Sequence, residues 1–260
     1  MDIEFLITTI KLKNLLFIVI ALTILNVHSQ YDYEKYSAIK YQKYSNWKIY
    51  DWSKTKRKIN FTITIKNFYS AGDNLTIQLT SFSSKNKNSI IRIFKNKQQI
   101  QKITEIMIFN PSNVQFEPVR IADINGDGLN DIKINIPYMG NGLAAMNYRI
   151  IYLFQTENGK FIKISFDDKM EKNRKEYDFD NDGNYEIITS NLINYKNHNY
   201  WTFNIFEFNN EKLENVNYKA NYPIMIQLLF NKNYKITDRI DRNKMKDYEI
   251  KIPTNIDYKK

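Results

Sequence analysis

The sequence predicts an all-β fold made of antiparallel strands, and three observations carry this prediction. Short segments alternate apolar and polar residues with a period of two, as strands with one buried face do. Turn sequences such as Asn-Gly separate pairs of these segments, as in β-hairpins. Between residues 59 and 137, no helical period continues for more than two turns. With 43% hydrophobic residues, including 19 Tyr and 16 Phe, the chain can build a substantial core.

The N-terminus has the pattern of an export signal. Lys11 and Lys13 precede an apolar stretch over residues 15–27, which is short for a membrane span of about 20 residues. The small residue Ser29 follows, so we expect residues 1–29 to be a cleavable signal peptide; the alternative is an uncleaved N-terminal anchor. No second apolar stretch of this length follows, and no stable membrane span is expected after the signal is removed. Because the chain also lacks cysteine, we expect a periplasmic or secreted bacterial protein without disulfides.

The rest of the chain divides into a lead-in and a single domain. Residues 30–57 are aromatic and charged without regular alternation, and we expect an extended lead-in there. Residues 58–260 are expected to form one domain of repeated β units. Its first strands are expected at residues 59–68, 74–82, 89–94 and 100–109, and its later hairpins at residues 147–164 and 199–216.

The C-terminal part leaves two alternatives open. Residues 222–230 fit either a strand or a short buried helix, and the turn sequence that follows favours the strand. Residues 238–249 fit a short helix or a polar connection.

Two acidic segments interrupt the strand pattern: "DINGDGLND" at residues 123–131 and "DFDNDGNYE" at residues 178–186. In each, acidic or amide residues occupy positions 1, 3 and 5, glycine occupies position 6, and a carboxylate returns at position 9. Alternate side chains on a tightly curved loop can direct their oxygens inward together, while glycine takes the sharp bend. Calcium takes six to eight hard oxygen ligands, which four side chains, the carbonyl at position 7 and water can supply. The expected calcium ligands are Asp123, Asn125, Asp127, Leu129 and Asp131 in one segment, and Asp178, Asp180, Asp182, Asn184 and Glu186 in the other.

The two acidic segments have three other interpretations: an EF-hand, a magnesium site and simple Asx turns. An EF-hand needs Glu at position 12, where this chain has Ile134 and Thr189. Magnesium fits less well, because a flexible cage of protein ligands suits calcium better. In the third interpretation the side chains only bond to the backbone, as in Asx turns. Matched positions in two segments favour calcium in a structural role.

The two acidic segments also define a repeat. Asp123 and Asp178 stand 55 residues apart, and each unit contains a strand, the acidic loop, a second strand and a hairpin. One such unit cannot bury its apolar face alone, so we expect stacked or radially arranged small sheets, four at most. The expected fold is thus a small or degenerate β-propeller-like repeat.

The acidic segments resemble the D-x-[DN]-x-D-G-x-x-D loop of FG-GAP and VCBS repeats, which build integrin-type β-propellers with calcium in the blade loops. The resemblance covers residues 114–216, and Glu186 replaces the last Asp of the motif. It implies calcium-binding hairpin loops and a degenerate bacterial periplasmic relative, a class that includes lysozyme inhibitors. The chain departs from the family in lacking a Phe-Gly-Gly-Ala-Pro segment, and its length excludes seven blades.

Composition and motifs limit the function classes. The formal net charge of +10 favours an anionic partner, such as an extracellular or periplasmic protein or an anionic glycan, and would repel a cationic lysozyme. The lysines are scattered, and no nucleic-acid partner is expected. The chain has no cysteine and no G-x-S-x-G or H-E-x-x-H motif, and His198 is expected to be a surface residue. We therefore expect an exported calcium-binding recognition or inhibitor module without catalytic activity; the alternative is a carbohydrate-active enzyme or its glycan-binding accessory domain.

Overall fold

The computed structural model describes residues 31–53, 58–82, 88–115, 117–169, 174–228 and 240–259. Strands make up 51% of it and helices 11%, which confirms the all-β prediction, and its sheets do not close into a barrel or a propeller. In this part of the chain, no helix is long and apolar enough to cross a membrane.

The chain divides into two compact units, residues 1–36 and residues 37–260. The predicted signal peptide lies outside the described residues. What is described of the first unit is one 3-10 turn, η1 (Asp32–Lys35), with the rings of Tyr31 and Tyr33 stacked at 5.2 Å.

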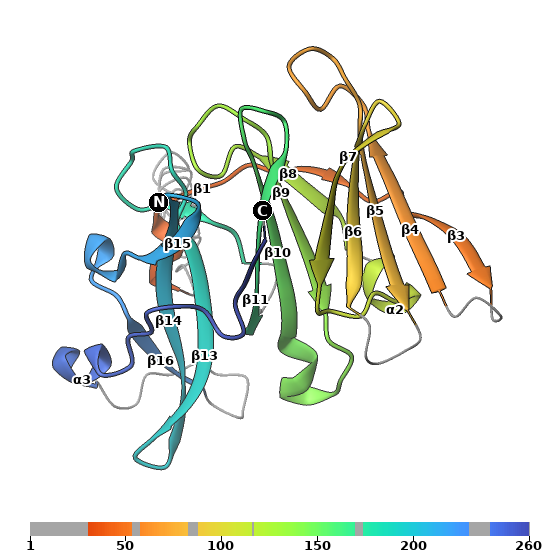
Figure 1. The fold of residues 1–260 in the computed structure, drawn as a ribbon. Helices are drawn as coiled ribbons and strands as arrows, with labels where there is room; N and C mark the ends of the chain where they lie inside the picture. Colours follow the sequence, from red (N-terminus) through yellow and green to blue (C-terminus); the bar gives the residue numbers. More distant parts are fainter. Residues whose placement is uncertain are drawn as a thin grey trace, which may run out of the picture. The chain divides into compact units, whose positions relative to one another are not determined.

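The first sheet of the second unit is a five-stranded antiparallel meander (Figure 1). Its strands follow one another in chain order: β3 (Lys48–Ser53), β4 (Lys58–Ile65), β5 (Leu75–Phe82), β6 (Ser89–Lys95) and β7 (Gln98–Glu105). The β6–β7 turn places Asn96 and Lys97 at φ values of 44° and 72°, as a tight hairpin of the right twist requires. β4 to β7 confirm the four strands predicted in this part of the chain, whereas β3 lies in the lead-in, where no strand was predicted.

The second sheet has six strands, in the order β17-β11-β10-β9-β8-β2. Four of them form an antiparallel meander: β8 (Val119–Ala122), β9 (Asp131–Pro137), β10 (Asn147–Gln155) and β11 (Phe161–Lys169). A one-turn helix, α2 (Pro111–Val114), precedes β8, and a 3-10 turn, η2 (Gly142–Met146), joins β9 to β10. The edge strands are β2 (Gln42–Tyr44) and β17 (Asp257–Lys259).

In the third sheet, β13 (Ile187–Tyr195) pairs with β14 (His198–Asn209), whose other side pairs with both β15 (Lys212–Asn215) and β16 (Ile224–Leu228). A two-residue strand, β12 (Tyr177–Asp178), pairs instead with β1 (Ser37–Ala38). The turn η3 (Asn217–Ala220) lies between β15 and β16, and α3 (Arg242–Lys246) follows. β16 is the predicted C-terminal strand, and α3 shows that residues 242–246 are helical.

The second sheet contributes side chains to two separate cores. Ile151 and Leu153 of β10 pack with residues of the first sheet. Their neighbours Tyr152 and Phe154 face the opposite way, into a core shared with the third sheet, and Phe154 stacks on Phe208 of β14 at 3.7 Å. Because successive side chains of a strand point to opposite faces, a strand buried on both faces must lie between two sheets.

Strands of the lead-in take part in three sheets. β1 pairs with β12, β2 with β8 and β3 with β4, so these parts of the lead-in are extended and hydrogen-bonded to the rest of the chain.

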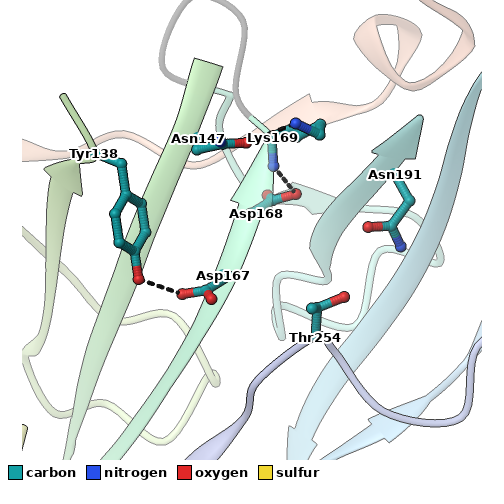
Figure 2. A pocket seen from close by; sticks show the side chains of 7 residues that line it. All are labelled: Tyr138, Asn147, Asp167, Asp168, Lys169, Asn191 and Thr254. Atoms are coloured by element: carbon teal, nitrogen blue, oxygen red, sulfur yellow. Dashed lines mark hydrogen bonds between the residues drawn. The ribbon is translucent and has the colours of Figure 1, made fainter. Parts of the chain in front are cut away.

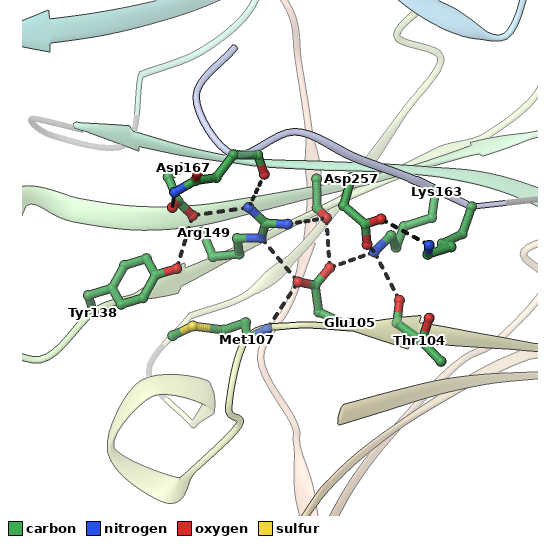
Figure 3. A network of polar contacts seen from close by, with 11 residues as sticks. Thr104, Glu105, Met107, Tyr138, Arg149, Lys163, Asp167 and Asp257 are labelled. Atoms are coloured by element: carbon green, nitrogen blue, oxygen red, sulfur yellow. Dashed lines mark hydrogen bonds and ion pairs between the residues drawn. The ribbon is translucent and has the colours of Figure 1, made fainter. Parts of the chain in front are cut away.

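A buried ionic network joins the first sheet to the second (Figure 3). The Glu105 carboxylate, at the end of β7, accepts hydrogen bonds from Arg149 Nε at 3.0 Å and from Lys163 Nζ at 2.8 Å. All three side chains are fully buried. Arg149 also binds Asp167 at 3.1 Å, and Lys163 binds Asp257 at 2.6 Å. Buried charges are tolerated only when paired and hydrogen-bonded, so this network fixes how the two sheets meet.

Candidate metal site in two acidic loops

The two acidic segments form connections of the same kind. The first loop (residues 123–131) joins β8 to β9, and the second loop (residues 178–186) joins β12 to β13. The expected ligands of each loop are thereby brought onto one short turn.

The loops share one set of hydrogen bonds, position by position. In the first loop, Asp123 accepts from the N–H groups of Asp127 and Gly128, at 3.2 and 2.8 Å, and Asp127 accepts from the N–H of Leu129 at 2.8 Å. Asp131 closes the loop by accepting from the N–H of Ile124 at 2.9 Å.

The second loop repeats these bonds. Asp178 accepts from Asp182 and Gly183, both at 3.2 Å, and Asp182 accepts from Asn184 at 2.8 Å. Glu186 closes the loop by accepting from Phe179 at 2.9 Å. The longer Glu side chain thus serves the same position as Asp131.

Backbone angles match as well. Position 6 is left-handed in both loops, with φ of 81° at Gly128 and 85° at Gly183. Position 4 is also left-handed, with φ of 72° at Gly126 and 61° at Asn181. Asn tolerates this region better than most residues with a Cβ, which accounts for its use here.

The two loops lie against one another. The N–H of Tyr185 donates to the carbonyl of Ile124 at 2.8 Å. A Cβ added to Gly126 would stand 2.9 Å from the carbonyl oxygen of Gly183, so only glycine permits this approach. The matched spacing in the sequence therefore corresponds to a matched and adjacent pair of turns.

The first loop holds three carboxylates without a cation. Among the described residues, no lysine or arginine forms an ion pair with Asp123, Asp127 or Asp131. Burial, together with the nearby charges of Asp127 and Asp123, raises the pKa of Asp131 to about 8, against the effect of its two backbone hydrogen bonds. Within the described residues, the buried Oδ1 of Asn125 has no hydrogen-bond partner.

The second loop is different because a lysine ammonium lies among its acids. Nζ of Lys219, carried by η3, lies 2.8 Å from Asp180, 2.9 Å from Glu186 and 2.6 Å from Glu207 of β14. Asp182 is farther away, at 3.5 Å. Burial opposes the charge of Lys219, but the hydrogen bonds that its ammonium donates to these carboxylates outweigh burial and raise its pKa.

The second loop also has the geometry of a metal-binding cluster. Carboxylate oxygens of Asp178, Asp180 and Glu186 lie within 4.8 Å of one another. The buried Oδ1 of Asn184 has no hydrogen-bond partner in the part of the chain that the structure describes, whereas its Nδ2 donates to Glu207 at 2.7 Å. Lys219 and Glu207 are the two participants that the loop motif could not reveal, because they lie outside the nine residues.

A separate pocket of about 340 Å³ lies between the second and third sheets (Figure 2). Its lining residues are Tyr138, Asn147, Asp167, Asp168, Lys169, Asn191 and Thr254. Asp167 accepts from Tyr138 at 2.9 Å and from Arg149 at 3.1 Å, and Asp168 pairs with the guanidinium of Arg174. Both carboxylates are therefore held in hydrogen bonds within the protein.

The loop of η2 runs beside this pocket and exposes two apolar side chains. Met139 is 67% exposed and Leu143 is 39% exposed. Exposed apolar side chains of this kind would suit a contact loop. His198 is exposed at the start of β14, in accordance with its expected surface position.

Comparisons with family models, with curated proteins and with solved structures each found no match.

Proposed function

We propose that this chain is an exported recognition module whose β sheets are arranged as in part of a propeller and are stabilised by calcium in the first loop. The observation that carries the proposal is the first loop itself. It holds three carboxylates that no described lysine or arginine neutralises, and beside them a buried amide oxygen without a partner. Calcium would supply the missing charge and accept that oxygen as a ligand.

The hydrogen bonds of the loops fit calcium and simple Asx turns equally. A carboxylate oxygen that accepts one N–H keeps a second lone pair for a cation. The difficulty of ionising all three acids is what favours calcium: burial and the neighbouring charges raise the pKa of Asp131, and a bound cation would favour its ionised form. Asp123, Asn125, Asp127 and Asp131 would hold the ion, with the carbonyl of Leu129. Its role would be to tie the end of β8 to the start of β9.

For the second loop, Lys219 offers its ammonium where a metal would otherwise be needed. A lysine tethered by the fold has a high effective concentration, so calcium must displace it to bind there. We therefore propose that calcium binds to the first loop and that Lys219 serves the second loop in its place.

Replacing Lys219 by methionine is expected to open the second loop to calcium. The variant removes the ammonium and keeps much of the side-chain volume, leaving Asp180, Glu186 and Glu207 without a cation. Isothermal titration should give one calcium ion per chain for the parent protein and two for Lys219→Met. Lys160→Met, at an exposed turn, is the control and should keep one. An unchanged number in Lys219→Met would contradict the substitution of lysine for metal.

The two loops should also differ when one ligand of each is removed. Asp127→Ala should abolish the rise in melting temperature that calcium gives. Asp182→Ala at the equivalent position should leave the rise in melting temperature within about 2 °C of the parent value. A substitution in a loop that holds no calcium should change the stabilisation by calcium by less than about 0.5 kcal/mol. Differential scanning fluorimetry with and without calcium measures both. Equal losses in the two variants would show that both loops bind calcium.

Glycan binding is a second candidate function, favoured by the pocket between the second and third sheets. It offers one aromatic ring, Tyr138, with the amides of Asn147 and Asn191 and the hydroxyl of Thr254. Its two carboxylates are engaged by Arg149 and Arg174, which leaves no free acid and base pair of the kind that glycoside cleavage requires. The pocket therefore supports binding of a sugar in preference to its cleavage.

A further inference from the structure

Three cations form a row across neighbouring strands of the second sheet. Lys43 of β2 is paired in register with Arg120 of β8, and Arg120 is paired with Lys133 of β9. All three side chains therefore point to the same face of the sheet. Like charges directly opposite one another destabilise a sheet, so this row costs folding free energy.

A second segment adds cations to the same place. Arg174 and Lys175 precede β12, and the backbone there is held to the lead-in by the N–H of Ile39, which donates to the carbonyl of Glu176 at 3.0 Å. Lys133 Nζ donates to the carbonyl of Arg174 at 3.0 Å and also to the Glu176 carboxylate. The result is a pocket of about 260 Å³.

Among the described residues, six cations and one tyrosine line this basic pocket, and no carboxylate does. The lining residues are Lys40, Tyr41, Lys43, Arg120, Lys133, Arg174 and Lys175. Three of the cations are buried, and each of them has an acidic partner. Arg120 pairs with Glu117, Lys133 with Glu176 and Arg174 with Asp168. Their pairing fixes the walls of the pocket.

The other three cations are exposed lysines. In the described part of the chain, Lys40, Lys43 and Lys175 have no ion pair with any carboxylate. The pocket therefore has three positive charges beyond those its own acids neutralise. Local rules of sheet design are broken in this way chiefly where function requires it.

We propose that the basic pocket binds a sulfate or phosphate ester group on an anionic glycan. Lysine and arginine together provide the charge-assisted donors that such oxyanions take. A volume of about 260 Å³ admits one oxyanion with an attached sugar, and the rest of a glycan would lie outside the pocket. Nucleic acid fits less well, because its binding relies on a groove along several phosphates and on free aromatic faces. The one aromatic ring of the lining, Tyr41, is held by a hydrogen bond of its hydroxyl to Glu176.

This inference rests on the proposed recognition role and gives that role a site, but it does not require calcium. Binding should therefore be measured in calcium and again in EGTA, well below the melting temperature of either form. If the protein binds the anion but does not bind calcium, only the metal proposal is contradicted. Loss of anion binding in both buffers would contradict only the pocket.

The pocket variant combines Lys40→Ala, Lys43→Ala and Lys175→Ala. These lysines are exposed, so the variant should fold. Its control combines Lys48→Ala, Lys102→Ala and Lys160→Ala, at exposed positions of β3, β7 and the β10–β11 turn, and has the same net charge. Galactose 6-sulfate, glucose 6-phosphate and unmodified galactose are the probes, with a short single-stranded oligonucleotide as a competing polyanion. Isothermal titration calorimetry gives the affinities.

We expect the sulfated or the phosphorylated sugar to bind at least tenfold more tightly than galactose. The pocket variant should lose about tenfold or more of that affinity, as expected for lost charged hydrogen bonds, and the control less than about threefold. The stronger of the two sugars identifies the ester. Equal losses in both variants, no preference over galactose, or preference for the oligonucleotide would each overturn the proposal.

Discussion

Replacing Glu105 by alanine is expected to lower the free energy of unfolding by about 3 kcal/mol, near the lower end of the range for removing one partner of a buried ion pair. Glu105 is fully buried and is shared by Arg149 and Lys163. Without it, the carboxylates that remain paired with the two cations among the described residues are Asp167 and Asp257, which are 24% and 19% exposed. These remaining carboxylates reduce the cost without removing it. Urea unfolding should show a lower midpoint with an unchanged slope.

Two further variants make this result specific. Glu214→Ala removes an exposed pair with Lys212 and should change the free energy of unfolding by less than about 0.5 kcal/mol. Replacing Glu105, Arg149 and Lys163 together by methionine should cost less than Glu105→Ala alone, because the three fully buried charges are then gone. The partly exposed Asp167 keeps its hydrogen bonds from Tyr138 and Asn255, and Asp257 keeps its pair with Lys259. If Glu105→Ala unfolds at the same urea concentration as Glu214→Ala, the network does not stabilise the contact between the sheets.

The same network gives the stability an acid dependence of known sign. Burial alone would raise the pKa of Glu105, but Lys163 and Arg149 outweigh it and hold the pKa below its usual 4.5. A carboxyl whose folded pKa is lowered contributes its full stability above the unfolded pKa and loses it as pH falls through the folded pKa. The difference between the parent protein and Glu105→Ala should therefore be largest above pH 4.5 and shrink in more acidic solution.

The strands of the first two sheets were predictable because their signals are local. The period-two alternation of residues 59–68 and 74–82 and the turn residues between strands specify antiparallel neighbours without further information. Pairings of the lead-in were not predictable in this way. β2 and β3 are edge strands, whose mixed aromatic and charged sequence lacks alternation, and their partners β8 and β4 are chosen by the packing of the whole unit.

The candidate metal site also has a part that local sequence predicts and a part that it does not. The spacing of the two acidic segments placed the expected ligands together, and the equal hydrogen bonds of Asp131 and Glu186 show why either residue serves position 9. Lys219 reaches the second loop only because β13, β14 and β15 return the chain to it. No sequence pattern within the nine-residue loop predicts that a lysine so distant in the chain will contact it.

The cations of the basic pocket show a different limit of prediction from sequence, which concerns burial. Arg120 and Lys133 alternate with apolar residues and fit a strand with a solvated face, but both are buried, at 4% and 3% exposure. The carboxylate partner of Arg120, Glu117, stands only three residues away, but that of Lys133, Glu176, lies 43 residues further along the chain. Alternation predicts which residues share a face of a strand, but not whether that face meets water.

Removing calcium with EGTA is expected to lower the melting temperature of the protein by about 5–10 °C. An ion present at about 100 times its dissociation constant adds about 2.7 kcal/mol to the stability, and each kcal/mol shifts the melting temperature of a domain of this size by about 2–4 °C. The physical reason is the repulsion among Asp123, Asp127 and Asp131, which a bound cation relieves.

The design of the measurement separates calcium from general screening of charge. Restoring calcium in excess over EGTA should recover the melting temperature, whereas the same concentration of magnesium should recover less, because magnesium demands a rigid octahedral site and gives up water reluctantly. Asp247→Ala, at a residue that directly follows α3 and whose side chain is 60% exposed, is the matched control and should keep the full response. If EGTA and calcium leave the melting curve unmoved, the acids of the first loop are satisfied by their backbone hydrogen bonds, and the loops are Asx turns that happen to share a spacing.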